Sequence, residues 1–170
     1  AHMVLLQVGL GLSWDHRQMA AIANEGLARN PEDIGLYFDV VGTLLPKWGG
    51  NAKDLDDYIN YATEQTKAQF GTGMYARMYS AAAEDQYGHA LFEDSHANWD
   101  KMKLGYEDMF ARYPNSPLRR NRFAYMACIA KDKTTLLTLL NELGSKIETS
   151  EWGPNPERSL EGCKRWATQL

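Results

Sequence analysis

The tetrapeptide Ala-Arg-x-Pro occurs twice in this chain, in residues 27–38 (LARNPEDIGLYF) and in residues 110–126 (FARYPNSPLRRNRFAYM). Each copy lies between two segments whose apolar residues recur at helical spacing. Comparable junctions occur at Pro31, Gly71, Pro114 and Pro154, at spacings of 40, 43 and 40 residues. A junction that recurs in this way predicts a repeated unit of two helices.

The residues before the first three junctions also match one another. Nine residues before the junction alanine the chain has Met19, Ile59 and Met102, and six residues before it has Ile22, Ala62 and Gly105. We therefore expect an all-α protein of stacked antiparallel helical hairpins, an α-solenoid of about nine helices with a period near 40 residues.

Polar residues that commonly cap helices mark the expected helix starts. A capping residue followed by proline is typical of a first helical turn, and the expected starts are Asn30-Pro31, Ser116-Pro117, Asn155-Pro156, Asn51 and Asp132. The last segment, residues 156–170, is expected to cover the open end of the stack as a capping helix. Residues 87–95 (YGHALFEDS) form the longest break in the helical pattern and are predicted to be a mobile loop.

The chain length of 170 residues fits one domain. Ala1, His2 and Met3 read as a cloning scar, which leaves residues 4–170 as a single helical-repeat domain. The apolar stretch VLLQVGLGL at residues 4–12 is too short to span a bilayer and is predicted to be a packed helix. An upstream signal or domain that has been removed remains an open alternative.

The overall charge argues against some partners. The formal net charge is −4, so no global basic field attracts the chain to nucleic acid or to anionic lipid. We expect no nucleic acid partner and no membrane insertion. The acidic excess slightly favours a basic protein partner.

Two cysteines, Cys128 and Cys163, are too few for a disulfide framework. Both lie in apolar helical segments, and we expect two buried free thiols. A single bridge between the two segments is the alternative, and it would indicate an oxidising compartment. Without that bridge, the cytoplasm is slightly favoured over the periplasm.

Residues 21–38 (AIANEGLARNPEDIGLYF) resemble tetratricopeptide or Sel1-type helical repeats of bacterial proteins. The resemblance covers residues 13–45 well and the later units loosely, and the period is longer than the roughly 34 residues of a tetratricopeptide repeat. It implies an α-solenoid that binds another protein or a peptide in a groove, without catalytic residues or cofactors. An adaptor and an inhibitor of the immunity type both fit that description.

An arginine-rich run, Arg119-Arg120-Asn121-Arg122, opens the helix after Ser116-Pro117. Cations at a helix N-terminus oppose the helix dipole, so something should offset them. One interpretation is a solvated face or ion pairs with acidic residues such as Glu107 and Asp108. The other is a dock for an acidic peptide or phosphate that uses the guanidinium fork.

An aromatic and methionine stripe follows Met74 (MYARMYSAAAEDQY). Such a stripe is either core or an adaptable binding surface. On the second interpretation, the candidate partner-binding residues of the whole chain are Tyr58, Tyr61, Tyr75, Tyr79, Trp99, Lys103, Arg119, Arg120 and Arg122.

One segment is a candidate for a catalytic or metal site, and it contains His89, Glu93, Asp94 and His96. Histidine and carboxylates can ligate a metal or transfer protons, but no HExxH or CxxC spacing is present. We therefore expect no catalytic residues, no metal and no cofactor, and a protein that works by binding a partner. The alternative function is a metal-dependent hydrolase or metal-binding protein that uses residues 87–96.

Overall fold

The computed structural model describes residues 2–169, apart from the side chain of His16, and this part of the chain is helical without any β-strand. Nine α-helices of ten or more residues and one of four residues, α6, occur in the described range, which confirms the all-α prediction. The helices are α1 (His2–Gly11), α2 (His16–Arg29), α3 (Ile34–Thr43), α4 (Ala52–Phe70), α5 (Gly73–Ala82), α6 (Leu91–Asp94), α7 (Trp99–Arg112), α8 (Pro117–Ile129), α9 (Lys133–Leu143) and α10 (Pro156–Thr168).

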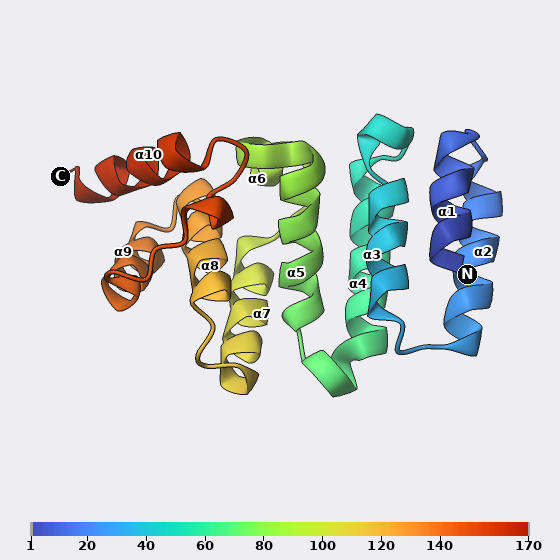
Figure 1. Cartoon of the computed structure of the whole chain (residues 1–170), viewed down its shortest axis with the longest axis horizontal. Helices are drawn as coiled ribbons and strands as arrows, with labels where there is room; N and C mark the ends of the chain where they lie inside the picture. The colour runs from blue at the N-terminus through green and yellow to red at the C-terminus, as the bar shows by residue number, and fades with distance from the viewer. Residues whose placement is uncertain (1, 170) are drawn as a thin grey trace.

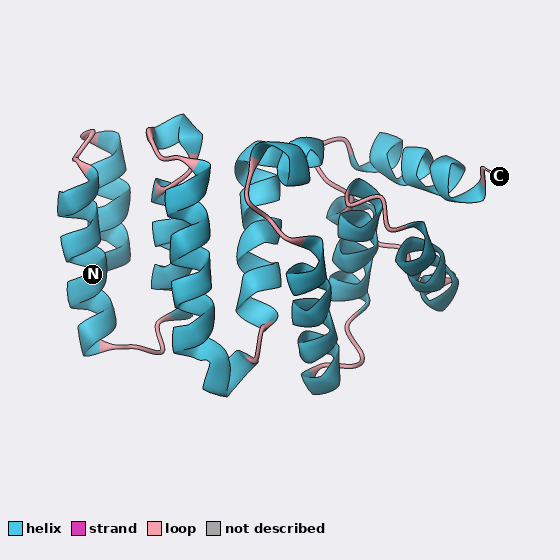
Figure 2. Ribbon diagram, turned by 180° about the vertical axis from the view of Figure 1, so that it is seen from behind, coloured by secondary structure: helices cyan, strands magenta, loops and turns pink. Residues whose placement is uncertain are grey.

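The helices follow one another along the long axis of the molecule in the order of the sequence (Figures 1 and 2). Helix α1 contacts α2 and α3, α4 contacts α5, α5 contacts α7, and α8 contacts α9. The junctions at Pro31, Gly71 and Pro114 separate α2 from α3, α4 from α5 and α7 from α8. Pro154 lies just before α10.

Three of the expected helix caps are confirmed by hydrogen bonds. The side chain of Asn51 accepts from the backbone N–H of Asp54 at 2.9 Å and caps α4. Ser116 caps α8 and Asp132 caps α9 in the same way. Asn155 precedes α10 as expected, although its side chain makes no capping hydrogen bond.

The expected helix start at Asn30-Pro31 is wrong. Asn30 instead ends α2, because its N–H donates to the carbonyl of Gly26 at 2.9 Å. Helix α3 begins at Ile34, where the Asp33 carboxylate accepts from the N–H of Leu36. An aspartate two residues after the proline therefore supplies the cap, and Pro31 belongs to the turn.

Helix α7 contacts its two neighbours in different ways. Against α5 it packs closely at Gly105, where a Cβ atom would lie only 2.7 Å from the carbonyl oxygen of Thr72. Against α8 it packs through aromatic rings, and the ring centroids of Tyr106 and Phe123 are 4.4 Å apart. Aromatic side chains therefore separate α7 from α8. The close contact between α5 and α7 instead requires that residue 105 has no side chain.

Residues 87–95 do not form the long loop that the sequence predicts. A π-helical turn (Ala83–Tyr87), a 3-10 turn (Gly88–Ala90) and α6 follow α5 directly. Leu91 is completely buried in the core and holds this segment against the rest of the protein. The buried leucine explains why the segment is helical despite its weak periodicity.

Cys128 and Cys163 form a disulfide, so the prediction of two free thiols is wrong. The bridge joins α8 to α10, and α10 contacts both α8 and α9. The two cysteines are 35 residues apart in sequence. The fold brings them together because α10 crosses the end of the preceding helices (Figure 1).

Helix α1 begins at His2, so it includes two of the three residues attributed to a cloning scar. Leu6 and Gly9 are buried, whereas Val4 and Leu12 are among several apolar side chains of this segment that are exposed. None of the described helices is both long enough and apolar enough to span a bilayer.

Candidate functional site

A groove of about 300 Å³ lies among α3, α5, α7 and α8, with three arginines in its walls. We call it the arginine groove. Residues that define it are Phe38 of α3, Arg77 and Ser80 of α5, and Leu118, Arg119 and Arg122 of α8.

Arg122 is fixed by two carboxylates. Its Nη1 lies 2.9 Å from Oε2 of Glu84, and its Nε lies 2.8 Å from Oε2 of Glu151. Burial alone would lower the pKa of Arg122, but the hydrogen bond and the charge of Glu151 raise it above its ordinary value. The charge of Arg122 is therefore neutralised within the protein, and this side chain has a structural role.

Arg77 has no such partner. Its guanidinium carbon lies 5.1 Å from the ring centroid of Phe38 and 5.6 Å from that of Phe70. Within the described residues, no carboxylate lies within 4.0 Å of it. Burial lowers the pKa of Arg77, and the positive charge of Arg119 lowers it further. Since arginine stays protonated in proteins, Arg77 is a partly desolvated positive charge without a counterion.

Arg119 is the second cation of the groove without a carboxylate. Its guanidinium carbon lies 4.7 Å above the ring of Tyr113, and no ion pair involves it in the part of the chain that the structure describes. Stacking on an aromatic ring holds a guanidinium in place while leaving its N–H donors free. Arg77 and Arg119 therefore repel each other in the same groove, and an anion placed between them would relieve the repulsion.

The rim of the groove also offers apolar surface. The side chain of Leu118 is 53% exposed, although leucine usually avoids water. Phe38 of α3 also lines the groove and is half-buried. The groove thus combines unpaired cations with apolar contacts, which suits a peptide that carries both carboxylates and apolar side chains.

The predicted partner-binding arginines do not share one environment. Arg120 forms an ion pair with Glu142 and lies over the ring of Phe110, outside the groove. Of the three arginines in the run, only Arg119 enters the groove without a carboxylate partner. The interpretation as internal ion pairs therefore applies to Arg120 and Arg122, although neither pairs with Glu107 or Asp108.

Two of the predicted aromatic residues belong to the core. Tyr75 and Tyr79 are almost completely buried, and the hydroxyl of Tyr79 donates to Oδ1 of Asp56 at 2.6 Å. Tyr58 is partly buried, and Tyr61 on α4 is 48% exposed. None of these four tyrosines lines the arginine groove.

Trp99 and Lys103 both bind the residue that caps α9. Trp99 Nε1 donates to Oδ2 of Asp132 at 3.0 Å, and Lys103 Nζ donates to the same atom at 3.1 Å. Burial alone would raise the pKa of Asp132, but hydrogen bonds from Thr135, Trp99 and Lys103 together hold it far below its ordinary value. This network ties α7 to α9.

The side chains proposed for metal binding in residues 87–96 do not converge. Among the described residues, no three histidine, cysteine or carboxylate side chains are arranged to hold a metal ion. His89 instead lies near α10, with its Nε2 3.4 Å from Oγ of Ser159.

Sequence reasoning missed Arg77, Phe38 and Leu118 as members of a site. A signal for Arg77 was present, because it is the only charged residue within α5. A lone charge in a mostly buried helix requires a partner or a function. The positions of Phe38 and Leu118 depend on how α3 and α8 flank α5.

Comparisons of the chain with protein-family models, with curated proteins and with solved structures found no match.

Proposed function

We propose that this protein is a non-catalytic protein–protein interaction module that binds an acidic segment of a partner in the arginine groove. The observation that carries the proposal is that Arg77 and Arg119, neither of which pairs with a carboxylate among residues 2–169, line the same groove. Carboxylates on the partner would form charge-assisted hydrogen bonds with these two guanidinium groups. Leu118 at the rim would contact an apolar side chain of the same segment.

The proposal includes an architecture. The hairpins α2–α3, α4–α5 and α7–α8 would be units of a tetratricopeptide- or Sel1-like α-solenoid with a period near 40 residues. Helix α10 would be its capping helix. The junctions at Pro31, Gly71 and Pro114 between these helices support the proposal, and such a stack presents a rigid groove at little entropic cost.

The local charge of the groove supports an acidic partner over the basic partner that the net charge of the chain favours. The whole chain is acidic, with a net charge of −4, which by itself favours a basic partner. The groove, however, is lined by three arginines and two glutamates, and both glutamates are already bound to Arg122. Short-range complementarity at a desolvated site outweighs the screened charge of distant surfaces.

The disulfide changes the expected compartment. Bridges persist in oxidising surroundings and are rare in the cytosol. The Cys128–Cys163 bridge therefore favours an oxidising compartment over the cytoplasm, and an adaptor or an immunity-type inhibitor would work there.

Selection of peptides from a random displayed library tests the acidic preference. We expect the peptides that bind the native protein to be enriched in Asp and Glu, and the enrichment to disappear for the double variant Arg77→Gln/Arg119→Gln. Arg112→Gln/Arg120→Gln removes the same charge outside the groove and should leave the selection unchanged. Peptides without an acidic bias, or equal selection by both double variants, would overturn the proposal.

Stability measurements distinguish the unpaired arginine from the paired one. We expect Arg77→Met to leave the free energy of unfolding within about 1 kcal/mol of the native value, because lost cation–π contacts are offset by removal of a partly desolvated charge without a counterion. Arg122→Met should lower it by about 3 kcal/mol, since it leaves the largely buried Glu151 unpaired. Urea unfolding followed by circular dichroism measures both. Equal losses for the two variants would show that Arg77 is also structural.

A further inference from the structure

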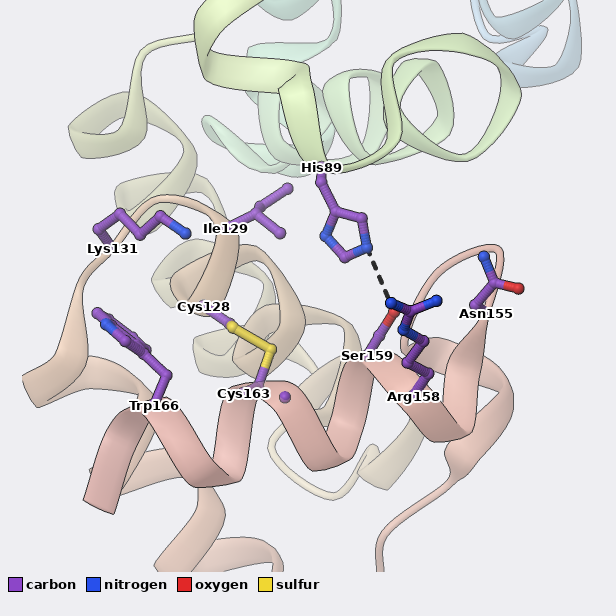
Figure 3. A pocket seen from close by; sticks show the side chains of 10 residues that line it. His89, Cys128, Ile129, Lys131, Asn155, Arg158, Ser159, Cys163 and Trp166 are labelled. Carbon is purple, nitrogen blue, oxygen red and sulfur yellow. Dashed lines mark hydrogen bonds between the residues drawn. A yellow bond between two sulfur atoms is a disulfide. The ribbon is translucent and has the colours of Figure 1, made fainter. Parts of the chain in front are cut away.

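A second cavity, of about 490 Å³, lies at the C-terminal end of the molecule and shares no lining residue with the arginine groove (Figure 3). We call it the C-terminal pocket. It lies between α10, the end of α8 and the turn that carries His89. The Cys128–Cys163 bridge forms part of its lining and fastens α10 to α8.

Each polar side chain of the C-terminal pocket can donate a hydrogen bond, and two of them are cations. Lys131 and Arg158 line it, together with His89, Asn155 and Ser159, and none of the described carboxylates does. Within residues 2–169, neither Lys131 nor Arg158 forms an ion pair. In Figure 3, Arg158 reaches from α10 towards His89, so positive charge gathers at that end of the pocket.

The hydroxyl of Ser159 lies at the same end of the pocket as Arg158 and His89, and its side chain is held in place by burial. Ser159 is 6% exposed, and its Oγ lies 3.4 Å from Nε2 of His89. Because this contact is long, both groups retain hydrogen-bonding capacity for a third partner. An anionic oxygen near them would accept from Ser159, from His89 and from the guanidinium of Arg158.

The other end of the pocket is apolar. Ile129, Trp166 and the disulfide line it, and Nζ of Lys131 lies 5.7 Å from the ring centroid of Trp166. Lys131 also has a positive φ of 61°, in the left-handed region where a helix usually ends with glycine. A lysine at this position strains the backbone, which is consistent with a use for its side chain.

We propose that the C-terminal pocket binds a small organic anion with an apolar body. The anionic oxygens would lie among His89, Arg158 and Ser159, and the apolar body would extend along the disulfide to Trp166. The volume of about 490 Å³ is typical of small-molecule sites. The same chemistry suits a carboxylate and a phosphate monoester.

A titration followed by ¹H–¹⁵N NMR tests this proposal on the oxidised full chain. Phenyl phosphate and benzoate serve as probes, and benzyl alcohol is the uncharged control. We expect saturable shifts at the amides of Lys131 and Gly162 and at the indole of Trp166, with no comparable shifts for benzyl alcohol. The probe that binds more tightly identifies the head group.

A pair of matched variants on α10 completes the test. Arg158→Gln should weaken binding of the preferred probe about tenfold, because a charge-assisted hydrogen bond is lost. Arg165→Gln removes one positive charge from the same helix, but at a position outside the pocket, and should leave binding unchanged. Equal effects of the two variants, shifts spread over the molecule, or no saturable shifts with either probe would overturn the proposal. The arginine groove shares no residue with this pocket, so neither outcome bears on the peptide site.

Discussion

Replacing Asn121 with leucine is expected to lower the free energy of unfolding by about 4 kcal/mol, because several buried polar groups lose their partners. Asn121 is completely buried in α8. Its Nδ2 donates to the carbonyl of Pro117 at 2.9 Å and to that of Lys146 at 3.0 Å. Its Oδ1 accepts from the N–H of Glu148 and from Nε1 of Trp152, both at 3.0 Å. One side chain therefore ties α8 to residues 146–152.

Leucine would fill the space but leave the Trp152 indole N–H, the Glu148 N–H and the Lys146 carbonyl unpaired. Each such group costs about 1–3 kcal/mol when it stays buried. Urea unfolding of the oxidised protein, followed by circular dichroism, measures the loss. Asn141→Leu on α9 is the matched control, because Asn141 is exposed, and it should change stability by less than about 0.5 kcal/mol. Similar losses for the two variants would contradict the role assigned to Asn121.

Removing the disulfide is expected to have an effect of similar size. The double variant Cys128→Ala/Cys163→Ala opens a link between residues 35 apart in sequence. A bridge that closes a loop of that length restricts the unfolded chain and thereby stabilises the folded protein by about 4 kcal/mol. The expected loss is therefore close to that of Asn121→Leu, although here it arises mainly in the unfolded chain.

The comparison of oxidised and reduced native protein supplies the control. Native protein with reductant should unfold at the same urea concentration as the double variant, and reductant should not affect the double variant. Amide hydrogen exchange should show the faster opening first in α10, the helix that the bridge fastens. If reductant leaves the unfolding of the native protein unchanged, the bridge does not stabilise the fold in solution.

The local features of the fold could be predicted from the sequence. Asn51, Ser116 and Asp132 cap helices where the sequence places them, because capping depends on a side chain and the amides within three residues of it. The prediction of where α3 begins was wrong for a related reason. Both Asn30 and Asp33 are residue types that cap helices, and only the geometry of the turn selects Asp33.

The features that depend on tertiary packing could not be predicted. The residues of the arginine run look alike in sequence, but Arg120 and Arg122 find carboxylates on other segments and Arg119 does not. Their partners, Glu142, Glu84 and Glu151, are between 22 and 38 residues away in sequence. The free cations of the groove are thus those that the packing leaves without a carboxylate.

The same reasoning applies to the disulfide and to residues 87–95. The two cysteines meet because α10 crosses α8, which no local pattern indicates. Leu91 is buried in the hydrophobic core, to which helices from α1 to α10 contribute, and this burial makes its segment helical. Long-range contacts therefore decided each of these errors.

Site-specific photo-crosslinking tests the proposed function most directly. A benzophenone amino acid at position 118, on the rim of the arginine groove, should capture one partner in the source cells, and the crosslinked segment should contain more Asp and Glu than Lys and Arg. The same amino acid at position 137, where Leu137 is also exposed but lies outside the groove, should not capture that partner. Capture at position 118 should be lost in Arg77→Gln/Arg119→Gln. No capture at position 118, a basic crosslinked segment, or capture that survives the double variant would contradict the assignment of the arginine groove as the binding site.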